Sequence, residues 1–280
     1  MRSIGGALVV LLLFGLSYPS LSYAQAAASA PASELSTDQI KTFLKTAKVI
    51  RTRTTDKGVT APKRLTLSDG VTTHDAVFQA IDERKMIARM GGAGRQETTE
   101  LNFVDSYKYN IAAYELARLL ELEHMMPVYV ERRVNGLLGS ISWFVPTLMD
   151  ESDRLKKKIQ PPSATDWNNQ MYRMRVFSSL VRDTDRNLTN VLVSPAWKVI
   201  MIDFSRAFRM QPELQHLSDL SKIDRRLLAK LESLDRDAIK KATTDFLNKS
   251  EIDALMVRRD LLVAHFKKLI AERGEDKVLY

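Results

Sequence analysis

The sequence contains no cysteine, and histidine occurs only four times in its 280 residues. Without a thiol the chain can form no disulfide, no thiolate zinc site, no iron–sulfur centre and no cysteine nucleophile. The histidines are scattered, with no two at metal-ligand spacing, which disfavours a histidine-rich zinc site. Disulfide-stabilised and thiol-dependent classes of protein are therefore excluded.

A long apolar run is also lacking, since the run at the amino terminus is too short to span a bilayer comfortably. It covers Leu8–Leu16, follows Arg2 and precedes Ser22-Tyr23-Ala24, which has small residues at the two positions that a signal peptidase reads. We therefore expect a signal peptide over residues 1–24, cleaved after Ala24, and a periplasmic or secreted mature protein with no membrane span. The alternative is an uncleaved amino-terminal anchor, whereas a lipoprotein anchor is excluded because no cysteine follows.

Neither sign of charge dominates, although the formal net charge is +8. The 34 acidic residues are interspersed with the 42 basic ones, and basic runs such as Lys156-Lys157-Lys158 are short. We therefore expect solvated helix and hairpin faces and disfavour nucleic acid as a partner, with a basic adaptor for lipid or nucleic acid kept as a third class of function. A hydrophobic content of 45% suffices for a core and excludes a wholly disordered or collagen-like chain.

After a leader at residues 25–35 that is rich in Ala, Ser and Pro, and is expected to be mobile, the patterns predict a β-rich half that ends at Pro146. Ser36 and Gln39 form a possible capping box for a short helix. Residues 84–100 contain three glycines and are expected to form a mobile loop. The other predicted elements are strands at 49–54, 64–67 and 76–81, a helix at 104–120, and strands at 128–134 and 138–145 joined by the hairpin signal Asn135-Gly136.

Beyond Pro146 the patterns become mainly helical. Apolar residues from Trp167 to Val181 repeat at the spacing of one helix face. Two short apolar strands are expected at 191–193 and 199–202, around a turn that contains Pro195. Further helices are predicted at 220–234, 235–247 and 251–272.

One segment of this second half carries the residues that phosphoryl transfer requires. Asp185 is followed five residues later by Asn190, then by the predicted hairpin, and then by Asp203. In such a site one aspartate orients or deprotonates the acceptor hydroxyl, while an asparagine and a second aspartate hold Mg²⁺ against the nucleotide phosphates. Asp183 is a rival for the first role, but five residues beyond it lies Leu188, which cannot bind a metal.

The motif Asp185-Arg186-Asn187 with Asn190, followed by Asp203-Phe204, resembles the catalytic and metal-binding motifs of two kinase groups. These are the phosphatidylinositol 3/4-kinases and the secretory-pathway kinases of the four-jointed and Golgi casein kinase type, in the atypical branch of the protein-kinase-like superfamily. The resemblance implies a two-lobed α+β fold, with a β-rich N-lobe at residues 36–146 and a helical C-lobe at residues 147–280.

By this resemblance Asp185 is the catalytic base, and Asn190 and Asp203 are ligands of Mg²⁺ or Mn²⁺ in a site that binds ATP. The expected function is an atypical phosphotransferase that acts outside the cytoplasm. Its acceptor can be a protein, a lipid or a glycan, because the C-lobe loops that choose the acceptor carry no readable motif.

The resemblance also places the nucleotide. Gly58 and Thr60 fall in the turn that covers the phosphates, although this turn has one glycine where many kinases have several. Residues 143–148 correspond to the hinge that meets the adenine ring. For Trp143 and Phe144, a place in the hydrophobic core is an equal alternative.

Two positions depart from the family pattern. Gln79 stands where a strand lysine grips the phosphates, and Asn110 stands where a helix glutamate pairs with that lysine. Two amides can form a hydrogen bond with each other, so the replacement leaves no charge unpaired, but it removes a fixed cation. Either another cation reaches the phosphates, with Lys63 as the candidate and Lys57 or Arg64 as substitutes, or the chain is a catalytically inactive pseudokinase that acts as a binding module.

Overall fold

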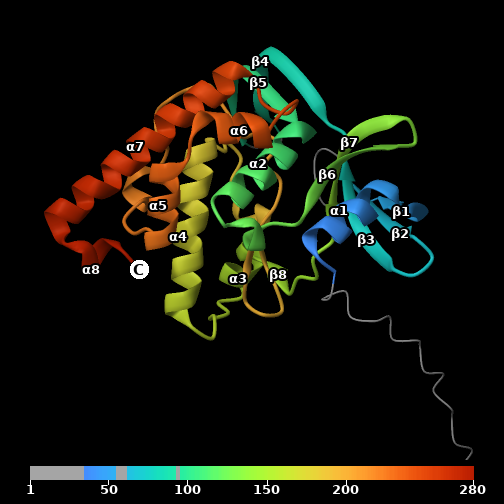
Figure 1. Ribbon diagram of the computed structural model, residues 1–280, viewed down its shortest axis with the longest axis horizontal. Coiled ribbons are helices and arrows are strands. Elements are labelled where there is room, and N and C mark those ends of the chain that lie inside the picture. The colour runs from blue at the N-terminus through green and yellow to red at the C-terminus, as the bar shows by residue number, and fades with distance from the viewer. Residues whose placement is uncertain (1–34, 55–61, 93–94) are drawn as a thin grey trace, which may run out of the picture. The chain divides into compact units, whose positions relative to one another are not determined.

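A five-stranded antiparallel sheet forms the amino-terminal half of the structure (Figure 1). The computed structural model describes residues 35–54, 62–92 and 95–280. The expected signal peptide, Lys57, Gly58 and Thr60 lie outside these described residues. The strands are, in spatial order, β1 (Lys48–Thr54), β2 (Lys63–Ser68), β3 (Thr73–Gln79), β7 (Leu137–Trp143) and β6 (Tyr129–Val134).

Helix α1 (Thr37–Thr46) covers one face of this sheet. It begins at the predicted capping box, in which the Ser36 hydroxyl accepts from the Gln39 amide and the Gln39 side chain accepts from the Ser36 amide at 2.8 Å. Phe43 and Leu44 are buried in the same hydrophobic cluster as the sheet residues Leu65, Leu67, Ala76 and Phe78. Each buried leucine or phenylalanine side chain contributes about 1.5–3 kcal/mol, so this contact holds α1 on the sheet.

The strand register decides which residues of β3 remain for a binding cleft. Ala76 pairs with Leu65 of β2, and Phe78 pairs with Lys63. Successive side chains of a strand point to opposite faces, so Val77 and Gln79 lie on the face away from α1. That second face lines the cleft described below.

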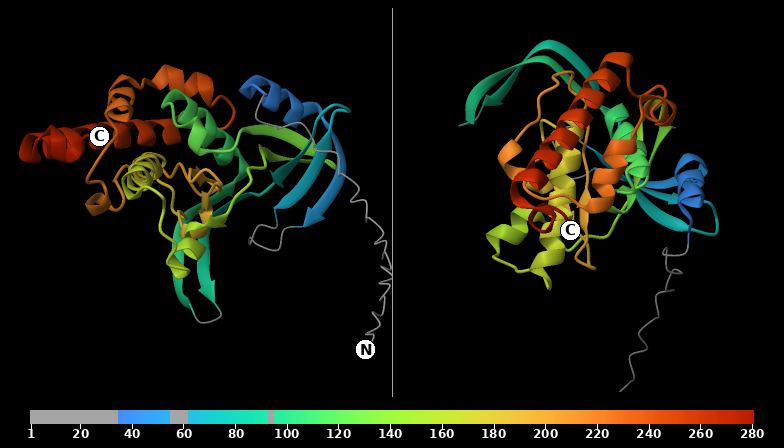
Figure 2. Two further views of the ribbon diagram at one scale, coloured as in Figure 1. Left: turned by 90° about the horizontal axis from the view of Figure 1, so that it is seen from below. Right: turned by 60° about the vertical axis from the view of Figure 1, so that its left-hand side comes forward.

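Residues 84–92 and 95–100 belong to two paired strands, which corrects the expectation of a mobile loop over residues 84–100. Strand β4 (Asp82–Gly92) pairs with β5 (Arg95–Ser106) as a separate two-stranded sheet that projects from the rest of the molecule (Figure 2). Charged residues lie on both faces of β4, so the sequence shows no alternation of apolar and polar residues, and alternation is the usual sign of a strand. Because β5 continues to Ser106, the next helix begins at Tyr107 rather than at the expected residue 104, with Ser106 as its N-cap.

Helix α2 (Tyr107–Leu119) lies between the sheet and the carboxy-terminal helices (Figure 1). It is buried on nearly every side, and its Tyr109 hydroxyl donates to Glu251 of the last long helix at 2.5 Å. Burial raises the pKa of Tyr109, and the carboxylate of Glu251 raises it further, so the phenol keeps its proton. A helix held on both sides in this way fixes the two halves of the molecule to each other.

The carboxy-terminal half is mainly helical, and the two-lobed α+β fold is confirmed. No helix in the described ranges is long and apolar enough to cross a bilayer. A short strand at 149–150, a short helix at 151–156 and the last helix at 275–278 were absent from the pattern-based prediction. The elements are β8 (Met149–Asp150), α3 (Glu151–Lys156), α4 (Ala164–Val181), β9 (Val191–Val193), β10 (Val199–Met201), α5 (Arg225–Ser233), α6 (Arg236–Ala242), α7 (Lys249–Arg273) and α8 (Glu275–Val278).

Candidate active site

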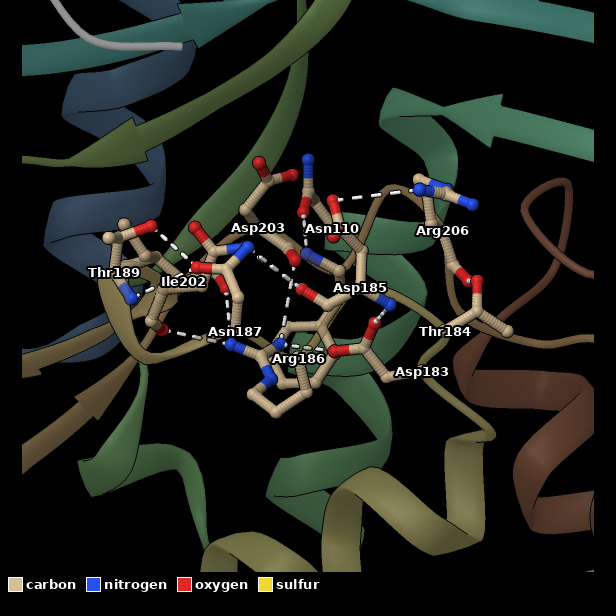
Figure 3. Close-up of polar contacts among 12 residues, drawn as sticks. Asn110, Asp183, Thr184, Asp185, Arg186, Asn187, Thr189, Ile202, Asp203 and Arg206 are labelled. Atoms are coloured by element: carbon tan, nitrogen blue, oxygen red, sulfur yellow. Dashed lines mark hydrogen bonds and ion pairs between the residues drawn. The ribbon is translucent and has the colours of Figure 1, made fainter. Parts of the chain in front are cut away.

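The loop after α4 and the segment after β10 meet to form the candidate site. Helix α4 ends at Val181 and is capped by Arg182, whose φ of 46° turns the chain out of the helix. The hairpin of β9 and β10 then brings Asn190 beside the second segment, because the Ile202 amide donates to the Asn190 carbonyl at 3.1 Å. The Asn190 side chain in turn donates to the carbonyl of Asp185 at 3.2 Å. These bonds place the three predicted residues Asp185, Asn190 and Asp203 on two adjoining loops, and Figure 3 labels Asp185 and Asp203 there.

Arg186 joins these two loops, a role that the sequence motif did not reveal. Its guanidinium donates to the carbonyls of Asn190 at 2.9 Å and of Ile202 at 2.7 Å. It also lies over the Phe204 ring, with 4.1 Å between the guanidinium carbon and the ring centre. Arg186 thus sets the distance between the Asn190 loop and the Asp203 segment.

The structure separates Asp185 from its rival Asp183. The Asp183 side chain has no exposed surface, pairs with Arg186 at 2.6 Å and accepts from the Asp185 amide at 3.0 Å. The Asp185 side chain is 45% exposed and faces away from that pair. Partial burial of the Asp185 carboxyl raises its pKa, and the guanidinium of Arg206 opposes that rise. Asp183 therefore supports the loop, while Asp185 can meet a substrate.

Asp203 offers an oxygen atom that fits a metal ion. Its Oδ1 is buried and has no hydrogen-bond partner among the described residues. Leaving a buried carboxylate oxygen unpaired is costly, so a cation there would stabilise the site. The residue also has a φ of 56°, a left-handed conformation that aspartate tolerates better than most residues. Carboxylate and amide oxygens such as those of Asp203 and Asn190 suit Mg²⁺ or Mn²⁺.

A further carboxylate, that of Asp105 at the end of β5, was missed by sequence reasoning. It is buried, and its Oδ1 also has no hydrogen-bond partner among the described residues. Burial raises the pKa of Asp105, and the charges of Asp203 and Asp185 raise it further. The carboxylates of Asp105, Asp185 and Asp203 therefore act on one another electrostatically, and the guanidinium of Arg206 opposes their mutual repulsion. Only the fold brings residue 105 to the site, so no local motif could have found it.

The two amides that replace the lysine–glutamate pair bond to each other. The Asn110 side chain donates to Gln79 Oε1 at 2.7 Å, and Asn110 Oδ1 accepts from the Phe204 amide at 2.7 Å. Asn110 thus links β3 of the sheet to the segment that follows Asp203. Strand β7 approaches closely here, since a Cβ on Gly139 would lie 2.4 Å from the backbone oxygen of Gln79.

Replacing Asn110 by alanine is expected to lower the free energy of unfolding by about 1–3 kcal/mol, because the buried Phe204 amide loses its acceptor. Urea denaturation of the two proteins measures this difference. Asn168→Ala, at an exposed position of α4, is the matched control and should change the stability by no more than about 0.5 kcal/mol. Equal stability of Asn110→Ala and the parent would contradict the linking role.

A cleft of about 200 Å³ lies beside Asp203, between the sheet and the helical half. Val77 and Gln79 of β3 line it together with Leu192, Ile202 and residues of the segment 143–147. The predicted hinge therefore faces the cleft. Trp143 belongs to the hydrophobic cluster and also lines the cleft, so both alternatives apply to it, whereas Phe144 lines the cleft and is not among the described members of that cluster.

Trp143 shows how the hinge is supported. Its ring stacks on His74 with 3.5 Å between ring centres and meets Phe43 of α1 edge to face. His74 Nε2 lies 2.9 Å from the carbonyl oxygen of Phe144. Burial lowers the pKa of His74, so the stacked ring is held in its neutral form. The hinge is thereby anchored to the first strands of the sheet.

The register gives no support to Lys63 as the cation for the phosphates. Lys63 pairs with Phe78 and shares its face of the sheet, opposite to the cleft, and it is not among the residues that line the cleft. Arg64 lies on the cleft face but pairs with Asp75 at 2.7 Å and stacks over Phe144 at 3.8 Å. Neither basic residue of β2 is therefore directed at Asp203.

Comparison with known proteins supports the fold. No family model matches the sequence, and no curated protein matches it. The structure is similar to that of hydra Fam20 with sugar, with a TM-score of 0.62 and 16% identity over 88% of this chain and 93% of that chain. It is also similar to the Golgi casein kinase with Mn/ADP bound (TM-score 0.60, 14% identity, 87% and 78% covered). For the Helicobacter pylori proinflammatory kinase CtkA the TM-score is 0.50 at 9% identity, with 83% and 97% covered.

The fold of this chain is that of the atypical protein-kinase-like proteins. Two of its structural neighbours, hydra Fam20 and the Golgi casein kinase, are of the type that the motif around Asp185 and Asp203 resembles. TM-scores of 0.59–0.62 at 14–16% identity show a shared fold and no more, so function has to be argued from the site itself.

Proposed function

We propose that this protein is a metal-dependent phosphotransferase that acts outside the cytoplasm and transfers a phosphoryl group from a nucleotide to an acceptor hydroxyl. One observation carries the proposal: Asp185 and Asn190 adjoin Asp203, whose buried Oδ1 has no hydrogen-bond partner among the described residues, and Asp203 lines the same cleft as the hinge. The Mn/ADP bound to the Golgi casein kinase supports the choice of ligand. The amino-terminal sequence pattern supports the periplasmic or secreted location.

In this proposal each residue has a defined task. Asp185 accepts the proton of the acceptor hydroxyl while the oxygen of that hydroxyl bonds to the γ-phosphorus. The bond from the γ-phosphorus to the bridging oxygen then breaks, which releases the nucleoside diphosphate. Asn190 and Asp203 would hold Mg²⁺ or Mn²⁺, which would neutralise charge on the phosphates. Arg186 keeps those two ligands at a constant separation through its bonds to both loops.

The alternative is a pseudokinase that binds a partner through the same scaffold. The observation that favours it is the closed amide pair of Gln79 and Asn110, which keeps α2 docked without a cation on β3. The double variant Gln79→Lys with Asn110→Glu distinguishes the two functions. Transfer activity that appears only in this variant would favour the pseudokinase, whereas activity already present in the parent favours the enzyme.

A thermal-shift titration with ATP and Mn²⁺ tests the proposed site. Because a ligand that binds only the folded state stabilises it, nucleotide at about 100 times its Kd should add about 2.7 kcal/mol and raise the melting midpoint by several degrees. Asp203→Asn should remove most of this shift. Asp237→Asn, at an exposed position of α6, is the control and should keep all of it.

Two results would contradict the proposal. One is a parent midpoint that does not respond to millimolar nucleotide with metal. The other is a shift of equal size with and without Mn²⁺ that Asp203→Asn leaves unchanged.

A further inference from the structure

The site described above has no lysine on β3, although a triphosphate brings several negative charges into it. Phosphotransfer sites neutralise the developing charge with fixed cations as well as metal ions. Among the described residues, Arg206 has its guanidinium beside the Asp185 carboxylate (Figure 3). Its surroundings show how it is held.

Arg206 follows Asp203 by three residues and is largely buried, with 14% of its side chain exposed. Its Nη1 lies 3.8 Å from Asp185 Oδ2, which is longer than a hydrogen bond. Its Nη2 pairs closely with Glu100 of β5. The guanidinium also lies over the ring of Phe103, at 5.2 Å from the ring centre.

The backbone of Arg206 is held as well as its side chain. Its carbonyl accepts from the Thr184 amide at 3.4 Å and from the Thr184 hydroxyl at 3.1 Å. Glu100 is itself fixed by a second ion pair, with Arg209 at 2.6 Å. The β4–β5 hairpin therefore orients the arginine, and one end of the guanidinium is left facing Asp185.

We propose that Arg206 is the fixed cation of the transfer site, where Nη1 bonds to an oxygen of the transferring phosphoryl group beside Asp185. This inference rests on the proposed phosphotransferase function. An acceptor hydroxyl on Asp185 stands about 3–3.5 Å from the phosphorus before reaction, so the phosphoryl oxygens come within reach of Nη1. Glu100 is the positioning residue, because its carboxylate sets the direction of the guanidinium.

Comparison of a diphosphate with a triphosphate tests this contact without relying on turnover. Titration calorimetry would use ADP and the non-hydrolysable triphosphate AMP-PNP, each with Mn²⁺. We expect the parent to prefer the triphosphate, and Arg206→Gln to weaken AMP-PNP binding about 10- to 100-fold while changing ADP binding by less than about 2-fold. Arg206→Lys keeps the positive charge but loses the planar, two-pronged donor geometry of the guanidinium, so it should retain part of the preference for AMP-PNP.

The remaining variants separate orientation from overall charge. Glu100→Gln should reduce the preference for AMP-PNP although Arg206 is intact, and Arg89→Gln, at an exposed position of the same hairpin, should leave it unchanged. A loss of affinity that is equal for ADP and AMP-PNP would show a merely structural role and overturn the inference. So would a full preference for AMP-PNP in Arg206→Gln. A parent that binds neither nucleotide would instead contradict the proposed function itself.

Discussion

Replacing Asp185 by asparagine is expected to slow phosphoryl transfer by a factor of about 10²–10⁴ while leaving nucleotide affinity nearly unchanged, because a positioned general base contributes that much and the amide cannot take a proton. The side chain is 45% exposed, so the fold should not depend on its charge. Single-turnover transfer from ATP labelled in its γ-phosphate measures the rate, and calorimetry with ADP and Mn²⁺ measures the affinity.

Asp183→Asn serves as the comparison for this experiment. Asp183 is buried against Arg186 and holds the Asp185 amide, so its loss should lower the melting midpoint as well as the rate. Asp185→Asn should lower the rate alone. If the transfer rate of Asp185→Asn equals that of the parent, Asp185 is not the base, and the assignment of the catalytic loop fails.

Replacing Arg258 by methionine is expected to destabilise the protein by about 3 kcal/mol or more, because buried carbonyls that lose their donors cost about 1–3 kcal/mol each. The Arg258 side chain has no exposed surface, and its guanidinium donates to the carbonyls of Leu180, Arg209 and Gln211 at 2.7–2.8 Å. Burial lowers the pKa of Arg258 to about 10, so it remains charged at neutral pH.

Denaturant unfolding of the parent and the variant at neutral pH measures this loss. Lys267→Met is the matched control on the same helix α7, since Lys267 forms an exposed pair with Glu232 and should contribute less than about 1 kcal/mol. Arg258 ties the end of α4 to the segment after Asp203, so its replacement should also weaken nucleotide binding. Equal effects of the two substitutions would contradict the role given to Arg258.

The β4–β5 hairpin shows where local patterns stop being informative. Glycines near 91–94 predicted a loop, and the charged residues of β4 hide any apolar face. The strands form because each pairs with the other, with Asp82 opposite Ser106, and pairing is a property of two segments rather than one. The same hairpin carries Glu100 and Asp105 to the site, so missing it meant missing both carboxylates.

The pair of amides, Gln79 and Asn110, was easier to predict from the sequence. Gln79 and Asn110 could be identified because each stands at the position of a motif whose order along the chain is known. Their contact then follows from the fold that the motif implies, and the structure contains it at 2.7 Å. The link from Asn110 to the Phe204 amide was not expected, because backbone donors carry no sequence signal.

Short-range order was readable from the residues themselves: the capping box at Ser36, the Asn135-Gly136 turn, and the spacing of Asp185, Asn190 and Asp203. Such features depend on a few neighbouring residues, so their physics is contained in the local sequence. The basic residue that would neutralise the phosphates could not be identified from the sequence. Its identity depended on strand register, in which one residue of difference puts Lys63 and Arg64 on opposite faces of the sheet, and on the packing that brings Glu100 against Arg206.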